Sequence, residues 1–238
     1  MDTPGTTGRT GLVFDAMKAL DRAAARAIAR HYLPSRFHYH YAKSKLGSDP
    51  LYAGVADALR GSTAPLLDLG CGLGLLAHTL RMHGVALAYR GVDSDAKKIA
   101  LATLSARNAG MDGIRFDVVD LAMTMPAHQG SVALLDVLQY LPADAQQRTL
   151  DAAISMLTPG ARLVIRTGLH DASTRARFTH FMDRVGRGIG WMNTSPKRYP
   201  DANALRARFA QAGLQVAIDP WYGKTPFNNW RIVATRSL

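Results

Sequence analysis

Glycines at alternate positions and an aspartate just before them are the residues of this chain best suited to hold a ligand. Gly70, Gly72 and Gly74 stand in the stretch LLDLGCGLGLL, with Cys71 between the first two. Such a loop after a strand lets the main chain turn sharply and approach a ligand closely. Asp68 precedes the loop, where a carboxylate repels a pyrophosphate and attracts an ammonium or sulfonium group. The loop therefore favours a ligand with a cationic end.

The spacing of the glycines argues against two common phosphate-binding motifs. The dinucleotide-binding fingerprint is G-x-G-x-x-G, but Leu75 occupies the position of its third glycine. A P-loop has a lysine directly after its last glycine, and no lysine follows Gly74. Neither a nicotinamide dinucleotide nor a nucleoside triphosphate is therefore the expected ligand.

Aspartates at the ends of two later apolar runs complete the outline of an adenosine site. Asp93 ends LAYRGVD, where an acid can accept both hydroxyls of a ribose. In FDVVDL, either Asp117 or Asp120 can accept from an adenine amino group. A single aspartate of this kind is more commonly a helix cap or a turn residue. Together with the glycines, the order of the motifs favours a binding role for Asp68, Asp93 and Asp120.

The elements that must position these residues alternate along the chain from residue 64 onward. Predicted helices at 75–83, 96–108 and 143–157 separate short apolar runs that read as strands at 65–69, 87–93, 114–120, 133–138 and 161–167. This alternation predicts right-handed crossovers and a mainly parallel sheet with both faces covered. Two more helices are predicted at 171–185 and 201–212, and a hairpin of strands at 215–218 and 230–235 closes the sheet with an antiparallel edge. The expected fold is an α/β, Rossmann-like sheet of seven strands.

The first 61 residues follow a different pattern, which predicts a helical cap. Apolar residues at helical spacing predict an amphipathic helix at 12–32, and Pro34 ends it. The stretch 36–46 is rich in aromatic and histidine residues, and Asp49-Pro50 opens a further helix that continues to Leu59. We therefore predict an N-terminal cap at 1–61 and a second domain at 62–238.

The composition fits one ordinary domain with a helical appendage. Of 238 residues, 47% are hydrophobic, which is enough to bury a core. The longest apolar runs are far too short to cross a bilayer, and residues 1–30 hold no signal-peptide apolar block, so we expect a cytoplasmic protein without a transmembrane segment. A single cysteine, Cys71, excludes a disulfide framework and a zinc site of paired cysteines, and no metal is expected.

Basic residues outnumber acidic ones by 29 to 18, and the excess is concentrated in residues 161–238, with 13 Lys and Arg against 4 Asp. A solvated basic surface is the ordinary explanation. Because the basic residues are spread out rather than gathered in a dense run, an acidic substrate or carrier surface is favoured over a nucleic acid.

Residues from about 62 to 168 resemble the class I S-adenosylmethionine-dependent methyltransferases. DLGCGLG matches the first motif of that family, and GVDSD and FDVVDL match the segments that carry its ribose-binding and adenine-side acids. LLDVLQYL is similar to its fourth-strand motif, and MLTPGARLVIR to the segment that leads into its fifth strand. The motifs also stand in the order and spacing of the family.

The resemblance implies that S-adenosylmethionine is the cofactor and leaves as S-adenosylhomocysteine. By this likeness, the main chain of 70–74 holds the methionine part, Asp93 the ribose and Asp120 the adenine. The full set of cofactor residues expected is Asp68, Gly70, Cys71, Gly72, Gly74, Asp93, Ser94, Asp120, Leu121 and Asp136. A terminal β-hairpin is also implied, in agreement with the last two predicted strands.

Methyl transfer from a sulfonium is an in-line displacement, so the protein mainly aligns the nucleophile with the methyl group and excludes water. A hydroxyl acceptor also needs a group that takes its proton. The candidates are His170, after the fifth strand, and His38 and His40, before the domain. Tyr140, after the fourth strand, is a further candidate catalytic residue. A surface or capping role stays open for His170, and a packing role for Tyr140.

Aromatic side chains in two places are candidates for acceptor binding. Tyr39 and Tyr41 in FHYHY can form a lid over the site, and Trp221 and Tyr222 lie in the predicted loop before the last strand. Gln139, after the fourth strand, can orient the acceptor. A contact that fixes the helices to the core is an equally good interpretation of FHYHY.

Several acceptor classes are disfavoured. Enzymes that methylate exocyclic amines of bases resemble one another in a [DN]-P-P-[FY] tetrad after the fourth strand, and DVLQY stands there instead. Cys71 belongs to the glycine loop, so it is not the thiolate that carbon-5 pyrimidine methylation needs. A small organic acceptor remains. An RNA methyltransferase and a non-catalytic protein that binds S-adenosylmethionine stay open as alternatives.

The flanking stretches FHYHYAKSKLGSDPLYAGV and GKTPFNNW also resemble the methyltransferases of bacterial aryl-polyene pigment biosynthesis. This likeness implies secondary-metabolite biosynthesis, with an aromatic or polyene acceptor held on an acyl carrier protein. The basic residues of the C-terminal third would then face the acidic carrier.

Overall fold

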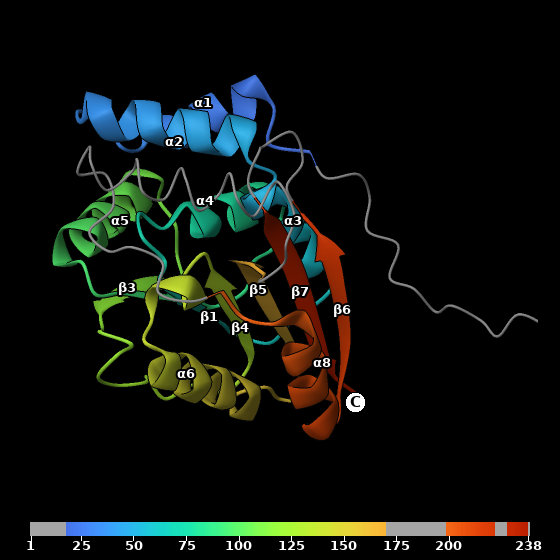
Figure 1. Cartoon of the computed structure of the whole chain (residues 1–238). Coiled ribbons are helices and arrows are strands. Elements are labelled where there is room, and N and C mark those ends of the chain that lie inside the picture. The colour runs from blue at the N-terminus through green and yellow to red at the C-terminus, as the bar shows by residue number, and fades with distance from the viewer. Residues whose placement is uncertain (1–17, 170–198, 222–227, 238) are drawn as a thin grey trace, which may run out of the picture.

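A computed structural model describes residues 18–169, 199–221 and 228–237, and within them a seven-stranded sheet lies between two layers of helices (Figure 1). The strands are β1 (Leu66–Leu69), β2 (Tyr89–Asp93), β3 (Ile114–Val118), β4 (Ser131–Leu135), β5 (Arg162–Gly168), β6 (Leu214–Pro220) and β7 (Asn229–Arg236). Their order in the sheet is β3-β2-β1-β4-β5-β7-β6. The α/β, Rossmann-like fold predicted from the sequence is confirmed.

The first five strands are parallel to one another, as the alternation of strands and helices predicts. β7 is antiparallel to both of its neighbours, β5 and β6. The last two strands form the predicted hairpin, which closes the sheet with an antiparallel edge. β7 lies inside the sheet, and β6, which runs parallel to β5, forms the edge. The central residues of β7 are buried because their side chains pack in the cores on the two faces of the sheet.

The helices are α1 (Arg22–Arg30), α2 (Arg36–Ser48), α3 (Leu51–Ala58), α4 (Leu75–Met82), α5 (Ala96–Asn108), the short 3₁₀ helix η1 (Leu138–Tyr140), α6 (Ala143–Ser155) and α8 (Ala202–Gln211). Capping aspartates explain where several of them begin. Asp95 accepts from the amides of Lys97 and Lys98, and α5 has the predicted bounds. Asp21 accepts from the Ala24 amide, so α1 begins at Arg22, although the predicted helix at 12–32 also includes residues 18–21. Residues 12–17 lie outside the described part of the chain. The helix predicted at 171–185 lies outside the described residues.

Alternate side chains of each central strand reach opposite cores. Leu67 and Leu134 pack with α6 and α8 in one core. Leu66 and Ala133 face the other way and pack with α3 and α4. A third cluster joins the cap helices to the glycine loop, because Leu73 packs there with residues of α1 and α2. The boundary predicted at residues 61 and 62 is therefore crossed by a shared core, and the division into two domains stays a prediction.

Within the described part of the chain, none of the helices combines the length and the apolar character that a membrane span requires.

Candidate cofactor and acceptor site

The glycine loop leaves the carboxyl end of β1, between β2 on one side and β4 on the other (Figure 1). The chain passes from β1 to β2 on one side and later from β3 to β4 on the other side, so the strand order reverses at this point. Such a reversal is the usual ligand crevice of an open α/β sheet. Val92 of β2 accepts from the amides of Gly70 and Cys71 at 2.7 and 2.9 Å, which holds the start of the loop against the sheet. The loop therefore has the position that the sequence predicts for it.

The three loop glycines all have positive φ angles, but for different reasons. A Cβ on Gly70 would overlap the Val137 side chain, and one on Gly74 would lie 2.7 Å from the Phe116 ring. At Gly72, with φ 54°, no atom of the described residues beyond its chain neighbours lies within 4 Å of that position. Gly70 and Gly74 are thus required by packing, whereas Gly72 leaves an open surface that a ligand can approach.

Asp93, at the end of β2, fixes this open part of the loop. Its Oδ2 accepts from the Gly72 amide at 3.0 Å, and its Oδ1 accepts from the Asp95 amide at 2.9 Å. A carboxylate has about four lone-pair positions, so it can still accept from both ribose hydroxyls. The structure thus brings Asp93 and Gly72 together, as the sequence predicts, and leaves neighbouring Ser94 exposed.

Asp68 lies beneath the loop and is 2% exposed. The Tyr89 hydroxyl donates to its Oδ2 at 2.5 Å, whereas Oδ1 has no hydrogen-bond partner among the described residues. Burial raises the pKa of Asp68 to about 7, although the bond from Tyr89 opposes the shift. At neutral pH the side chain is therefore partly protonated, and a nearby cation would stabilise its charged form.

Cys71 is buried in the loop, and its chemistry follows from that place. Burial raises the pKa of its thiol well above the usual value, and the carboxylates of Asp68 and Asp93 raise it further. The thiol stays protonated, so Cys71 does not supply a thiolate nucleophile.

The two acids offered for the adenine end differ in their partners. Arg90 and Arg115 form ion pairs with Asp117 at 2.7 and 3.3 Å. Asp120 is exposed after β3, and its Oδ1 accepts from the Ala122 amide at 2.9 Å in a tight turn. Of the two, Asp120 keeps the better placement for a ligand. The adjacent Leu121 is buried in the core, where it supports the turn.

Asp136 follows β4 and is the only described non-glycine residue with a positive φ, at 59°. Both of its carboxylate oxygens accept from the guanidinium of Arg166 on β5. Arg166 also donates to Asp49, between α2 and α3, at 2.6 Å. The sequence predicts Asp136 as a cofactor residue, but it indicates neither the pairing of Asp136 with Arg166 nor the contact between Arg166 and Asp49. An arginine directly after the apolar run Leu163–Ile165 of β5, in a strand expected to be buried, was the signal that could have indicated a buried ion pair.

The candidate acceptor residues occupy two elements. On η1, Gln139 is buried and accepts from the Thr167 hydroxyl at 3.2 Å, and Tyr140 beside it is half-buried. On α2, His38 shares a 2.7 Å hydrogen bond with Ser35 through Nδ1, and the exposed His40 stands edge-on to the Tyr39 ring. Tyr41 is half-buried on the same helix. His170 and Tyr222 lie outside the described residues.

Trp221 needs a correction, because the structure places it in the core. Its side chain is 0% exposed and packs against Gly54 of α3, where a Cβ would overlap the indole ring. The Arg231 guanidinium lies over the same ring, 5.4 Å from its centre. The aromatic side chain therefore fixes α3 to the sheet instead of facing an acceptor.

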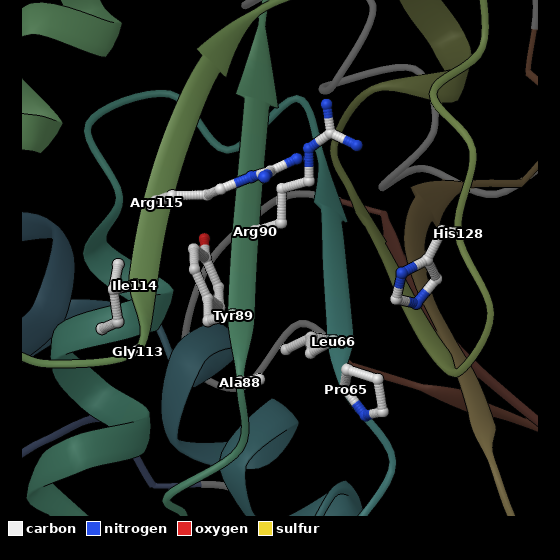
Figure 2. Close-up of a pocket in the computed structure, with 9 residues that line it drawn as sticks. All are labelled: Pro65, Leu66, Ala88, Tyr89, Arg90, Gly113, Ile114, Arg115 and His128. Carbon is white, nitrogen blue, oxygen red and sulfur yellow. The ribbon is translucent and has the colours of Figure 1, made fainter.

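A separate hollow of about 390 Å³ lies at the opposite, amino edge of the sheet (Figure 2). It is formed by the starts of β1, β2 and β3, and is lined by Pro65, Leu66, Ala88, Tyr89, Arg90, Gly113, Ile114, Arg115 and His128. Because the glycine loop stands at the carboxyl edge, this hollow is not part of the cofactor site.

The chain belongs to the methyltransferase domain family, whose model matches residues 39–217. The family and the fold are those of the class I S-adenosylmethionine-dependent methyltransferases, so S-adenosylmethionine is the cofactor.

Among curated proteins, the chain is similar to the ubiquinone biosynthesis O-methyltransferase of Xylella fastidiosa, with 32% identity over 108 residues, or 44% of this chain and 42% of that protein. The protein of the same name from Paracidovorax citrulli is 31% identical over 127 residues, which is 50% of each chain. The matched region thus spans at most about half the length of these relatives.

Solved structures show the same fold at lower identity. An O-methyltransferase family protein from Burkholderia thailandensis has a TM-score of 0.64 and 20% identity, over 96% of this chain and 67% of that one. The magnesium protoporphyrin IX methyltransferase of Synechocystis, solved with bound S-adenosylhomocysteine, has a TM-score of 0.62 and 17% identity, over 91% of this chain and 98% of that one.

Proposed function

We propose that this chain transfers the methyl group of S-adenosylmethionine to a hydroxyl oxygen of a small organic acceptor. The observation that carries the proposal is the open Gly72 surface held by Asp93 at the carboxyl edge of the sheet. The residues present fit the cofactor, because a partly ionised, buried Asp68 lies beneath the same loop and has one oxygen without a hydrogen-bond partner in the described ranges. When bound, the cofactor supplies an electrophilic methyl group on a sulfonium.

The side chains of this chain then bind and orient rather than react. Asp93 would accept from ribose hydroxyls while it holds the Gly72 amide, and Asp120, in the turn after β3, would accept from the adenine end. Asp68 favours a cationic methionine end by electrostatic attraction. Leu73 packs under α1 and α2, so the cap covers one side of the loop and helps to keep water from it.

An oxygen acceptor is supported by the relatives, which are named O-methyltransferases. Gln139 and Tyr140 on η1 would orient the hydroxyl, and Tyr39 and Tyr41 on α2 would provide apolar contact surface. The proton of the hydroxyl would pass to a histidine, for which His38, His40 and His170 are the candidates.

The acceptor is either a free small molecule or a group attached to a carrier protein. A free small molecule is favoured, since the relatives belong to ubiquinone biosynthesis. An aromatic or polyene group on an acyl carrier protein is the second candidate, and the basic excess of residues 161–238 favours it. Salt dependence distinguishes the two, because attraction between a basic surface and an acidic carrier weakens as ionic strength rises.

Calorimetric titration with S-adenosylhomocysteine tests the site. We expect binding by the wild type and a loss of at least about tenfold in Asp93→Ala, which lacks the ribose contact and the support of Gly72. Asp95→Ala is the matched control, since Asp95 caps α5 but has no predicted contact with the ligand. Equal affinity in the wild type and Asp93→Ala would overturn the site assignment.

Transfer of labelled methyl groups then tests the reaction. Free phenols, the same phenols on an acyl carrier protein, and RNA form the panel of acceptors. Product from a free phenol, insensitive to salt, supports the main proposal. Product from the carrier-bound form alone supports the second candidate, and product from RNA alone contradicts both. Cofactor binding without product on any acceptor indicates a non-catalytic protein.

A further inference from the structure

Four charged side chains of alternating sign connect the cap to the carboxyl edge of the sheet. Lys45 on α2 contacts Asp49 at 2.7 Å, and Asp49 accepts from Arg166 at 2.6 Å. Arg166 in turn holds Asp136 through two nitrogens of its guanidinium. Three segments that are far apart in the sequence are thus tied together by one continuous set of ion pairs.

Burial makes these contacts interdependent. The side chains of Arg166 and Asp49 are 3% and 9% exposed. Burial by itself would raise the pKa of Asp49, but Arg166 and Lys45 outweigh it and lower the pKa to about 2. A buried charge that loses its partner is strongly destabilising, whereas the complete chain of four charges is neutral. The planar guanidinium also sets the distance between the two carboxylates it contacts.

Asp136 connects these ion pairs to the glycine loop. Its amide donates to the Arg166 carbonyl at 2.9 Å, so both its main chain and its side chain are held by the same residue. The next residue, Val137, packs so closely on Gly70 that a Cβ there would overlap it. Asp136 also has a left-handed backbone conformation, which persists only where surrounding contacts enforce it. Displacement of Asp136 would therefore move the side chain on which the loop rests.

We propose that Arg166 is a positioning residue for methyl transfer, which couples the docked cap to the glycine loop through Asp49 on one side and Asp136 and Val137 on the other. This inference rests on the cofactor site proposed above. It predicts that cofactor affinity depends on Asp49, a residue of the cap that has no place in the glycine loop itself. Arg166 acts here through other residues and does not touch the reacting atoms.

Asp49→Asn is the sharpest variant for a test. Asparagine keeps the size of the side chain and an oxygen for the Leu51 amide, which Asp49 caps at 3.0 Å, but it removes the charge that faces Arg166. Asp57→Asn is the matched control, because Asp57 is also a cap aspartate and pairs only with the exposed Arg60 in the contacts described. We expect S-adenosylhomocysteine to bind about tenfold more weakly to Asp49→Asn and unchanged to Asp57→Asn, measured by calorimetry on the full chain.

A second pair of variants separates positioning from general loss of stability. Arg162, on the same strand, donates to the Ala58 and Arg60 carbonyls and so fixes the end of α3 away from the glycine loop. Arg162→Met should lower the melting temperature without weakening S-adenosylhomocysteine binding. Arg166→Lys, which keeps one charge but not the planar contacts, should weaken binding and speed amide exchange in residues 66–76.

The outcomes are distinguishable. If the wild type does not bind S-adenosylhomocysteine, the cofactor site itself is wrong. If the wild type binds and Asp49→Asn and Arg166→Lys bind equally well, only the positioning role is overturned. Equal losses in Arg162→Met and Arg166→Lys would also overturn it, because both variants would then act through stability alone. If Arg166→Lys does not fold, the comparison of Asp49→Asn with Asp57→Asn decides the question.

Discussion

The hydroxyl of Tyr32 donates a 2.7 Å hydrogen bond to the main-chain carbonyl of Leu73, and so joins the cap to the glycine loop. Burial raises the pKa of Tyr32, so the hydroxyl keeps its proton and remains a donor at any physiological pH. Leu73 also packs in the cluster formed by α1 and α2. This bond is one contact between the cap and the loop. The ion pairs around Arg166 are a second connection, which runs from the cap to the ends of β4 and β5.

Tyr32→Phe should weaken both folding and cofactor binding. The variant leaves a buried carbonyl without its donor, which costs about 1–3 kcal/mol of unfolding free energy. We expect a lower midpoint in urea and a several-fold loss of S-adenosylhomocysteine affinity, because the loop loses one of its fixed points. Tyr39→Phe on α2 is the control, and it should change neither quantity by much. An unchanged affinity in Tyr32→Phe would contradict a role for the cap contact in holding the loop.

Asp68 should make cofactor binding release protons near neutral pH. Its pKa is about 7 in the folded chain, so about half of the molecules carry the proton at pH 7. A sulfonium or ammonium group nearby would lower that pKa and expel the proton. Calorimetry at pH 7 in buffers of different ionisation enthalpy measures this release, which we expect to approach 0.5 proton per S-adenosylmethionine, roughly, by the same titration argument. In Asp68→Asn the release should vanish.

The same group should make the ligand-free protein less stable as the pH rises. The folded state binds the Asp68 proton with a pKa of about 7, against an ordinary value of 3.8, so its contribution is fully present below pH 4 and is lost as the pH rises through 7. The shift corresponds to about 4 kcal/mol at most. The unfolding free energy of Asp68→Asn, relative to that of the wild type, should therefore increase as the pH rises from 4 to 8. Urea unfolding at a series of pH values measures this difference. A constant difference across that range would show that Asp68 titrates normally.

Substitution of the loop glycines should separate stability from binding. Gly74→Ala places a methyl group 2.7 Å from Phe116 at a positive φ, and should cost about 1–3 kcal/mol of unfolding free energy. Gly72→Ala meets no atom of the described part of the chain within 4 Å, so its cost is the strain of the positive φ, about 1 kcal/mol. S-adenosylhomocysteine should nevertheless bind much more weakly to Gly72→Ala, because the methyl group would occupy the open surface of the loop. Thermal unfolding and calorimetry on both variants test this contrast.

The cofactor half of the site could be predicted because its residues lie next to strand ends. The glycine loop follows β1 directly and Asp93 ends β2, and neighbouring parallel strands carry both to one edge of the sheet. The ion pairs around Arg166 could not be predicted in this way. Asp49 and Arg166 are 117 residues apart, and an aspartate before Pro50 has a sufficient local explanation as the start of a helix.

The fold shows the same division between local and long-range information. The start of α5 could be predicted because Asp95 caps it through amides two and three residues away. The place of β7 between β5 and β6 could not, because pairing with β5 depends on contacts with a distant strand and not on the hairpin itself. Trp221 was misassigned for a related reason, since its partner Gly54 belongs to the cap helix α3.

The contact between Gly54 and Trp221 gives a last prediction, in which a helix-stabilising change should destabilise the protein. Alanine is the better helix former by about 1 kcal/mol, but a Cβ at Gly54 would overlap the buried indole ring. We expect Gly54→Ala to cost about 1–3 kcal/mol of unfolding free energy through this overlap. Trp221→Leu should also be destabilising, because it leaves a cavity. The double variant should lose less than the two single losses combined, since the smaller side chain makes room for the methyl group. Additive losses in urea unfolding would mean that Trp221 does not pack on α3, and would reopen its assignment to the acceptor site.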